Sequence, residues 1–522
     1  MSTSLDVDCL PAEASASRGR TCQHLQLANP LAAVWTTVQG CLISTKLTHM
    51  RILSIALFCC AFVTVNAQKT KQEVAEAINS KYATYSTIAK KIWDYAEVGY
   101  KETKSSALLE ETLSQAGFKI EKGVAGIPTA FIATYGSGKP VIGILGEYDA
   151  LPGISQDAVP EVKTINGKTA GHACGHHLFG TASAAAAIEI KNWMIATKKT
   201  GTLKFYGTPA EEGGAGKVYM VREGLFNGVD VVLHWHPASI NNAETGGTLA
   251  NKNGKFRFYG IASHASASPE RGRSSLDAVE AMNVMTNMMR EHVTPETRIH
   301  YVITRGGEAP NVVPAFAEVY YYVRHPSRDE VKAVWERMVK AAQGAAMGTE
   351  TRMEVEVMGG VYNMLPNETL AKVMDKNLRT VGGYTYNEQE REFAATIQKT
   401  LSGSVPGLES TNEIEPYLLK DGVASTDVAD VSWVVPTVGL ATATWVPGTP
   451  AHSWQAVAAG GTSIGFKGMM VAAKTLALTA IDIFESPDVI SESWKELRKK
   501  RGENFVYEAL LGDRKPALNY RD

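Results

Sequence analysis

Residues 171–177 read Gly-His-Ala-Cys-Gly-His-His, and a helical stretch over residues 182–196 follows them. Cys174 is the only cysteine beyond residue 60, so it has no disulfide partner in the body of the chain. A thiol between imidazoles is typical of a site for a borderline divalent metal such as zinc, manganese or cobalt. One such segment supplies about half of the ligands that a metal site needs.

Short β-rich runs surround this segment, at residues 129–135, 141–147, 202–207 and 229–235. They alternate with stretches of helical spacing at residues 71–116, 182–196 and 216–223. This alternation predicts an α/β fold with a mixed, mostly parallel sheet and helices on both faces. The functional residues of such a domain lie at the carboxyl ends of the strands.

Acidic residues follow two of the predicted strands. Asp149 comes after the run 141–147, where it would orient a ligand histidine or simply form a turn before Pro152. Glu211 and Glu212 follow the run 202–207. One of two adjacent carboxylates can bind a metal while the other faces the substrate water. The alternative is that both complement the dipole of the next helix.

Histidines follow two further strands. Strand alternation predicts that His234 and His236 share one face, so either is a candidate ligand. His452 lies in a turn after another apolar run. About five candidate ligands are too many for one tetrahedral zinc and fit two metals with a shared bridging group. They are Cys174, His176, Glu212, His234 or His236, and His452.

Composition limits the class of protein. A hydrophobic content of 44% and a charged content of 20% are typical of a globular chain, whose length predicts more than one domain. The net charge of -2 gives no electrostatic reason to expect a nucleic-acid or anionic-membrane partner. Residues 213–217, Gly-Gly-Ala-Gly-Lys, lack the first glycine and the hydroxyl of a phosphate loop, so we reject that interpretation.

The N-terminal region resembles a targeting sequence. Residues 50–67 contain Met-Arg, an apolar run from Ile52 to Val65 and a small residue at Ala67, as in a cleaved signal peptide. Residues 1–49 precede this segment, and we interpret them as an upstream misassigned start or an artificial extension, with a genuine leader as the alternative. We expect an exported protein, periplasmic or extracellular, without a stable membrane span after cleavage.

The middle of the chain predicts a second domain. Residues 256–261, 299–305 and 317–324 are strand-like, and residues 275–291 carry an apolar side at helical spacing. This β-α-β-β order suggests a small sheet with helices on one face.

Several motifs, in this order, resemble the M20 metallopeptidases. They are Gly146-Glu-Tyr-Asp-Ala-Leu, Gly171-His-Ala-Cys-Gly-His, Glu211-Glu-Gly-Gly, Trp235-His-Pro, residues 425–433 and Gly448-Thr-Pro-Ala-His-Ser-Trp-Gln. Within that family the chain is similar to the amidohydrolase branch, which contains aminoacylases, plant auxin-conjugate hydrolases and aminobenzoyl-glutamate hydrolase. The resemblance covers residues 71–484.

The resemblance implies a site residue by residue. It makes Glu211 the general base and implies two divalent metal ions, Mn²⁺ or Zn²⁺. It favours His236 over His234, because the aminobenzoyl-glutamate branch has Trp-His-Pro, and it leaves His172 and His177 open. The implied metal ligands are Cys174, His176, Glu212, His236 and His452.

The resemblance also implies a domain plan and partners. The catalytic domain spans residues 68–250 and 371–485, an inserted α+β lid and dimerisation domain spans 251–370, and residues 486–522 form a C-terminal tail. His264 would stabilise the oxyanion, across the dimer, while Asn311 and Arg324 would bind substrate. A homodimer is expected, or a heteromer with a related subunit.

The implied activity is hydrolysis of an amide in a small N-acyl or aminobenzoyl amino acid by metal-activated water. An exported dipeptidase or carboxypeptidase of the same family is the alternative. A catalytically inactive M20-like binding or dimerisation protein is the alternative from another class.

Overall fold

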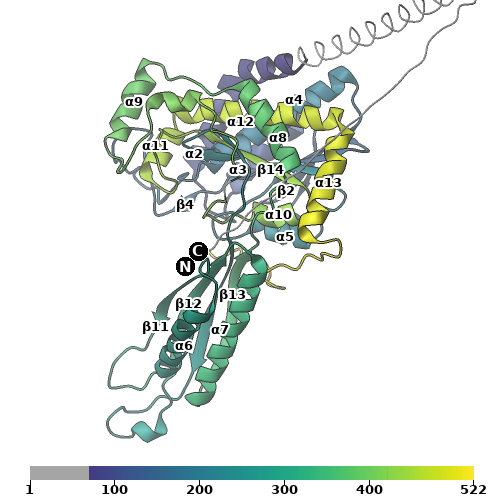
Figure 1. The fold of residues 1–522 in the computed structure, drawn as a ribbon. Helices are drawn as coiled ribbons and strands as arrows, with labels where there is room; N and C mark the ends of the chain where they lie inside the picture. The colour runs from purple at the N-terminus through teal and green to yellow at the C-terminus, as the bar shows by residue number, and fades with distance from the viewer. Residues whose placement is uncertain (1–69, 420) are drawn as a thin grey trace, which may run out of the picture. The chain divides into compact units, whose positions relative to one another are not determined.

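A computed structural model describes residues 70–419 and 421–522 (Figure 1). The predicted leader and signal peptide lie outside the described residues. The largest sheet has strand order β1-β2-β6-β3-β7-β14-β8, with β9 paired to β14. Its strands are β1 Lys119–Lys122, β2 Phe131–Ser137, β3 Val141–Gly146, β6 Gly201–Gly207, β7 Val231–Leu233, β8 His236–Ala238, β9 Asn242–Glu244 and β14 Thr437–Ala443.

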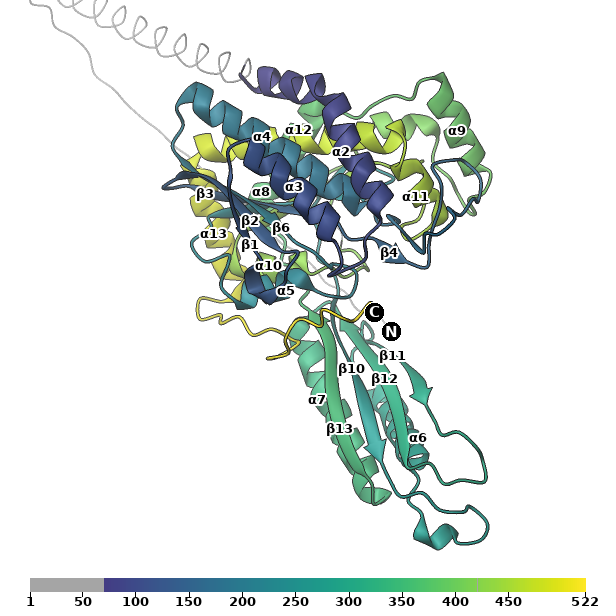
Figure 2. The ribbon, with the colours of Figure 1, turned by 180° about the vertical axis from the view of Figure 1, so that it is seen from behind.

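The central strands of this sheet are parallel. β3 pairs in parallel with β6 and β7, and β14 pairs in parallel with β7 and β8. The pairs β1–β2, β2–β6 and β9–β14 are antiparallel. Figures 1 and 2 show helices on both sides of the sheet. The predicted mixed, mostly parallel α/β sheet is therefore confirmed.

The helices of the α/β domain come from both halves of the chain. The helical spacing at residues 71–116 becomes helical residues 70–80 and two separate helices, because Ala96 adopts a left-handed conformation that ends the first of them. A short two-stranded sheet pairs β4 Leu151–Pro152 with β5 Ala170–Gly171. The helices are α2 Tyr82–Tyr95, α3 Thr103–Gln115, α4 His176–Thr197, α5 Gly216–Arg222, α8 Glu368–Val381, α9 Glu388–Gln398, α10 Val428–Val434, α11 Trp454–Gly460, α12 Ser463–Glu485 and α13 Pro487–Arg501.

Helix α12 is the one helix among the described residues that is long and apolar enough to cross a membrane. However, 83% of its most apolar window is buried within the fold, and the helix packs against α4, α8 and β14. The apolar character of α12 is therefore that of a core helix.

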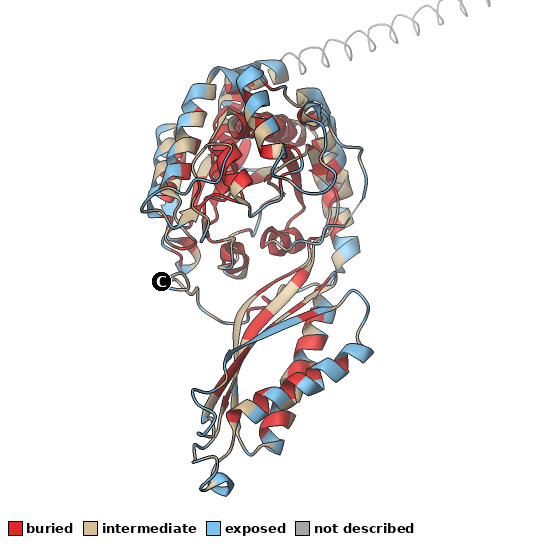
Figure 3. Ribbon diagram, turned by 90° about the vertical axis from the view of Figure 1, so that its left-hand side faces the viewer, coloured by how far each residue is buried: buried red, intermediate tan, exposed pale blue. Residues whose placement is uncertain are grey.

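A second sheet has strand order β11-β12-β10-β13 and is antiparallel throughout. We call this sheet and its two helices the lid (residues 250–361). Alternate residues of β12 are buried, as expected when helices cover one face. Figure 3 shows buried residues on both the strands and the helices of the lid. The elements are β10 Ala250–Tyr259, α6 Ser275–Met289, β11 Arg298–Arg305, β12 Phe316–His325, α7 Arg328–Gly348 and β13 Arg352–Val361.

Candidate metal centre

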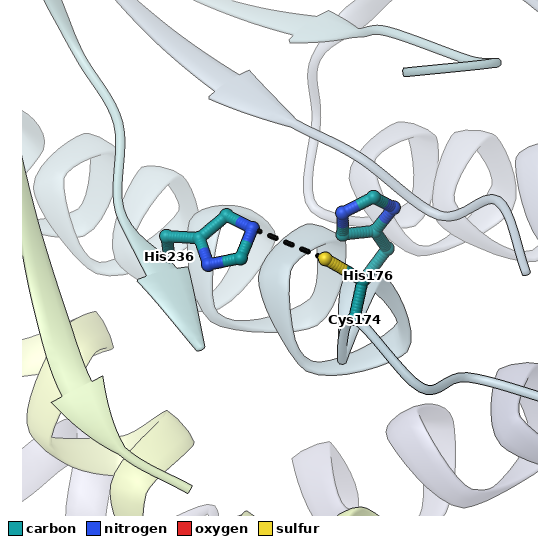
Figure 4. A group of neighbouring side chains, drawn as sticks. All are labelled: Cys174, His176 and His236. Carbon is teal, nitrogen blue, oxygen red and sulfur yellow. Dashed lines mark hydrogen bonds between the residues drawn. The ribbon is translucent and has the colours of Figure 1, made fainter. Parts of the chain in front are cut away.

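Three candidate ligands meet where α4 begins and β8 begins. Cys174 lies one residue before Gly175, the N-cap of α4, and His176 is the first residue of that helix. The Cys174 Sγ lies 3.5 Å from His236 Nε2 (Figure 4). Gly175 has φ +79°, and a Cβ there would lie 2.6 Å from the Cβ of Pro237. The glycine therefore allows the helix start and the His236 segment to approach each other.

Two further candidate ligands complete the cluster. The Nε2 of His452 lies 3.1 Å from the Oε1 of Glu212. The potential ligand atoms fall into three groups, each within 4.8 Å: Cys174, His176 and His236; Cys174, Glu212 and His452; and His176, Glu211 and Glu212. His452 has φ +59°, and its backbone N–H donates to the carbonyl of Ala173, which ties its turn to the Cys174 segment.

Asp149 organises this cluster from behind. Its Oδ1 accepts a hydrogen bond from His176 Nδ1 at 2.9 Å, and its Oδ2 accepts one from the backbone N–H of Glu212 at 2.9 Å. A carboxylate on Nδ1 fixes the tautomer of a histidine and leaves Nε2 free to bind a metal. The position of Asp149 therefore corresponds to the histidine-orienting alternative and not to a simple turn.

The donor set fits divalent cations. The Nε2 of His176 and the Oε1 of Glu212 are buried and make no hydrogen bond of good geometry, although they lie 3.1 Å from Glu147 Oε2 and His452 Nε2, respectively. Buried polar atoms without a hydrogen bond are costly, so their convergence indicates a site for a ligand. The Nδ1 of His236 is hydrogen-bonded to the Pro237 carbonyl oxygen at 2.7 Å, and the Nε2 of the same ring points toward Cys174. Thiol, imidazole and carboxylate together suit a borderline divalent metal.

The charges around His176 depend on one another. Burial lowers the pKa of His176, but electrostatic attraction by the acidic groups of Cys174, Glu147 and Asp149 outweighs burial and raises that pKa well above its usual range. Burial also raises the pKa of the Cys174 thiol. Metal binding would therefore release a proton from this thiol, as is usual for cysteine ligands.

Glu211 stands beside the ligands and has a perturbed acidity. Burial raises the pKa of its carboxyl well above the usual range, and the charges of Glu147, Glu212 and Asp427 raise it further. A carboxyl with a raised pKa that lines a cavity is suited to accept and return a proton near neutral pH.

A buried charge network that no sequence pattern indicated lies below the cluster. The Lys217 side chain is fully buried, and its Nζ lies 2.6 Å from Glu147 Oε1 and 2.7 Å from Asp427 Oδ1. Its backbone N–H also donates to Asp427 Oδ2 at 2.9 Å. The other oxygen of Glu147, Oε2, lies 3.1 Å from His176 Nε2. Lys217 therefore neutralises the carboxylates of Glu147 and Asp427 next to the candidate ligands. The glycine-rich sequence before Lys217 did not indicate this role.

A cavity of about 730 Å³ opens beside Glu211 and His452. Arg324 of β12, one of the two predicted substrate residues, lines it. The residues after α13 also line it, through Arg514, Tyr520 and Arg521. No role was predicted for this C-terminal segment, because nothing in its local pattern indicates where the chain returns.

Two of the predicted site residues, His264 and Asn311, lie away from the candidate ligands of their own chain. His264 pairs with Val312 in an isolated bridge of the lid, and the backbone carbonyl of Asn311 accepts from the N–H of Ala265. Neither His264 nor Asn311 lines the cavity beside Glu211. A role in this site would require them to come from a second copy.

The expectation that His234 and His236 extend from one regular strand is wrong. β7 ends at Leu233 and β8 begins at His236. The His234 ring packs over Gly439 of β14, where a Cβ would collide with it, and its Nε2 lies 3.6 Å from Glu244 Oε2. Burial lowers the pKa of His234 to about 3. The structure brings His236, and not His234, into the cluster.

His172 and His177 form a separate buried pair. Their rings lie 4.8 Å apart, His172 Nε2 is 3.1 Å from the Ile92 carbonyl oxygen, and His177 Nε2 is 2.9 Å from that of Gly460. Burial lowers the pKa of both imidazoles. Their contacts are therefore those of neutral packing residues.

Comparison with known proteins places the chain in a family. Residues 248–350 match the model of a peptidase dimerisation domain of M20 type. The chain is 42% identical over 456 residues to a p-aminobenzoyl-glutamate hydrolase subunit of Escherichia coli (strain K12), covering 82% of this chain and 95% of that protein. The chain belongs to the M20 peptidase family. The predicted resemblance is thereby confirmed, as is the expectation of a hydrolase that acts on amide bonds.

Other M20-type relatives agree with this placement. The chain is 29% identical over 446 residues to Xaa-Arg dipeptidase of Mus musculus, covering 82% of this chain and 92% of that protein. An aminobenzoyl-glutamate utilization protein from Klebsiella pneumoniae shares the fold, with a TM-score of 0.55 and 18% identity over 78% of this chain and 97% of that one. A dinuclear metal-binding M20 peptidase from Bacillus subtilis shares it with a TM-score of 0.53 and 17% identity, over 78% and 99%.

Proposed function

We propose that this M20 hydrolase cleaves the amide bond of a small aminobenzoyl or N-acyl amino acid, of the aminobenzoyl-glutamate type. The observation that carries the proposal is the clustering of five candidate ligands, two of which, Glu212 and His452, line the same cavity as Glu211. The 42% identity to an aminobenzoyl-glutamate hydrolase subunit over 95% of its length supports the substrate class.

The proposed cofactors are two divalent ions, Mn²⁺ or Zn²⁺, held by Cys174, His176, Glu212, His236 and His452. When bound, such ions lower the pKa of a water molecule and polarise the amide carbonyl. Asp149 holds the His176 ring through Nδ1, so that its Nε2 would be available to hold an ion.

Glu211 performs the proton transfers in this proposal. Its carboxylate takes a proton from the attacking water and returns it to the nitrogen of the leaving amine. The raised pKa of Glu211 suits both directions of transfer. His264 and Asn311 would approach the same cavity from a second copy, with His264 donating a hydrogen bond to the oxyanion.

We further propose a homodimer that forms through the lid, with a heteromer of related subunits as the alternative assembly. The match to a peptidase dimerisation domain over residues 248–350 supports this. β11 is an edge strand, and its Tyr301, Val302 and Ile303 expose large apolar side chains, as does Met288 of α6. Export of the mature protein, based on residues 50–67, is part of the proposal.

A dipeptidase is the second candidate, favoured by the similarity to Xaa-Arg dipeptidase. However, Arg324, Arg514 and Arg521 line the cavity and would repel a cationic residue of the substrate. A panel of p-aminobenzoyl-glutamate, N-acetyl amino acids and dipeptides ending in arginine would separate the two activities.

The decisive experiment compares two variants with Mn²⁺ and Zn²⁺ supplied separately. Glu211→Ala should abolish turnover and leave metal content nearly unchanged, whereas Cys174→Ala should lower both. Glu223→Ala, an exposed glutamate after α5, is the matched control and should change neither. Turnover that survives Glu211→Ala would remove the assigned base, and an absence of amide cleavage with either metal would refute the proposed activity.

A further inference from the structure

The cavity beside Glu211 has an uneven distribution of charge. The acidic residues that line it are Glu211, Glu212 and Asp427, which belong to the candidate metal centre or to the Lys217 network. The rest of its charged lining is basic, and consists of Arg324 from the lid, Arg514 and Arg521 from the C-terminal segment, and the ligand His452. A substrate that fills this space therefore meets positive charge beyond the reacting bond.

Only one of the three arginines is paired with an acid. Arg514 contacts Glu356 Oε1 at 3.0 Å and donates to the Val357 carbonyl at 2.6 Å. Within residues 70–419 and 421–522, Arg324 and Arg521 form no ion pair with a carboxylate. Arg324 makes a long 3.4 Å hydrogen bond to Ser425 Oγ. Arg521 donates from Nη2 to the Glu212 carbonyl at 2.6 Å, and its buried Nε has no acceptor.

The C-terminal segment is held so that Arg521 is presented to the cavity. Tyr520 donates to the same Glu212 carbonyl at 3.0 Å, and its ring packs edge-on against Tyr100 with centroids 5.5 Å apart. Further back, Arg222 donates to the carbonyl of Gly512 at 3.0 Å and to that of Arg514 at 2.7 Å. These contacts fix the segment before substrate arrives, which reduces the entropic cost of binding.

We propose that Arg521 is a specificity-determining residue, and that Arg521 and Arg324 each bind one carboxylate of the substrate. The inference rests on the proposed amidohydrolase function and narrows its substrates to amides whose amino-acid half is a dicarboxylate. Two guanidinium groups without acidic partners match two carboxylates, and each can bind its carboxylate through paired N–H donors. The C-terminal segment is then part of the substrate pocket.

The test uses three substrates that differ only in charge. p-Aminobenzoyl-glutamate carries both carboxylates, p-aminobenzoyl-glutamine lacks the side-chain carboxylate, and p-aminobenzoyl-isoglutamine lacks the α-carboxylate. Arg521→Gln should lower kcat/KM for the glutamate substrate by about 10- to 100-fold, mainly through KM. It should change kcat/KM by less than about threefold for one of the two monoamides, which already lacks the carboxylate that Arg521 binds. Metal content should not change.

Lys515→Gln is the matched control, because it removes one positive charge from the same segment without touching the cavity lining. It should alter no substrate preference. Equal losses of Arg521→Gln on all three substrates, or no loss on any, would overturn the inference and leave Arg521 as a support of the Glu212 loop.

If Arg521→Gln does not fold, Arg521→Lys provides the same comparison, because lysine keeps a donor for the Glu212 carbonyl but loses the paired donors. An unchanged ratio of glutamate to monoamide activity in Arg521→Lys would equally overturn the inference. Failure of the proposed function is distinct from both outcomes, since the wild-type protein would then cleave none of the three amides.

Discussion

Lys217→Met should destabilise the protein although Lys217 belongs to neither the ligands nor the cavity. Methionine has a similar length and fills a similar space, so the main loss is the positive charge between Glu147 and Asp427. Removing one partner of a buried ion pair costs about 3–5 kcal/mol, because the other charge stays buried without compensation. Here two carboxylates lose the same partner, which places the expected cost at the upper end of that range.

The expected change in melting temperature follows from the number of residues that unfold together. Residues 70–522 unfold with an entropy of about 1 kcal/mol per degree, at roughly 2.1 cal/mol/K per residue. A cost of about 4–5 kcal/mol therefore lowers the Tm by about 4–5 °C. Thermal melts followed by circular dichroism, with a chelator present, separate this charge effect from any loss of metal.

Asp427→Asn in the Lys217→Met background supplies the control. It removes one uncompensated carboxylate and keeps an oxygen for the Lys217 backbone N–H, which lies 2.9 Å from Asp427 Oδ2. The double variant should regain about half of the lost Tm, since the two changes are strongly coupled. A Tm of Lys217→Met within about 1 °C of wild type, or a double variant that melts below the single one, would refute the reasoning.

Three further predictions concern other parts of the molecule. Gly175→Ala should lower metal content in elemental analysis, because its Cβ would lie 2.6 Å from Pro237 at a φ of +79°. Burial raises the pKa of Asp430 to about 7, so wild-type stability should fall as pH rises from about 4 through about 7. The Tm of Asp430→Asn should depend less on pH over that range. A Tm profile parallel to that of the wild type would contradict this prediction. Val302→Lys on the edge strand β11 should shift the protein from dimer to monomer in light scattering, and an unchanged mass would exclude this edge as the interface.

The sequence predicted the parts of the fold that local patterns determine. Apolar runs such as residues 141–147 became β3, and the helix after His176 extends through residue 197, because burial on both sides favours continuous apolar sequence. The lid was predicted in part: the helix at 328–348 and the strand at 352–361 complete its β-α-β-β-α-β order. The M20 motifs added the expected ligand set, whose members the structure brings together.

What the sequence could not predict depends on long-range contacts. Strand alternation treats His234 and His236 alike, and only the neighbouring Gly439 on β14 decides where the His234 ring packs. Lys217 follows four small residues and has no local sign of burial, yet two carboxylates from distant segments surround it. Arg521 reaches the Glu212 loop from more than 300 residues away in the chain.

The charge of the cluster at 171–177 explains why these distant residues matter. Five carboxyl groups act on His176, on Lys217 or on one another, and Lys217 is the buried lysine among them. They belong to Glu147, Asp149, Glu211, Glu212 and Asp427. Burial alone lowers the pKa of Lys217, yet the attraction of Asp427 and Glu147 raises it, so its charge is retained. Lys217 and His176, whose pKa is also raised, are two cations beside these five acids. The raised pKa of Glu211 and Asp427 favours their neutral forms, whereas the lowered pKa of Asp149 and Glu212 favours their ionised forms. The remaining negative charge faces the ligand atoms, where two divalent ions would complete the electrostatic balance.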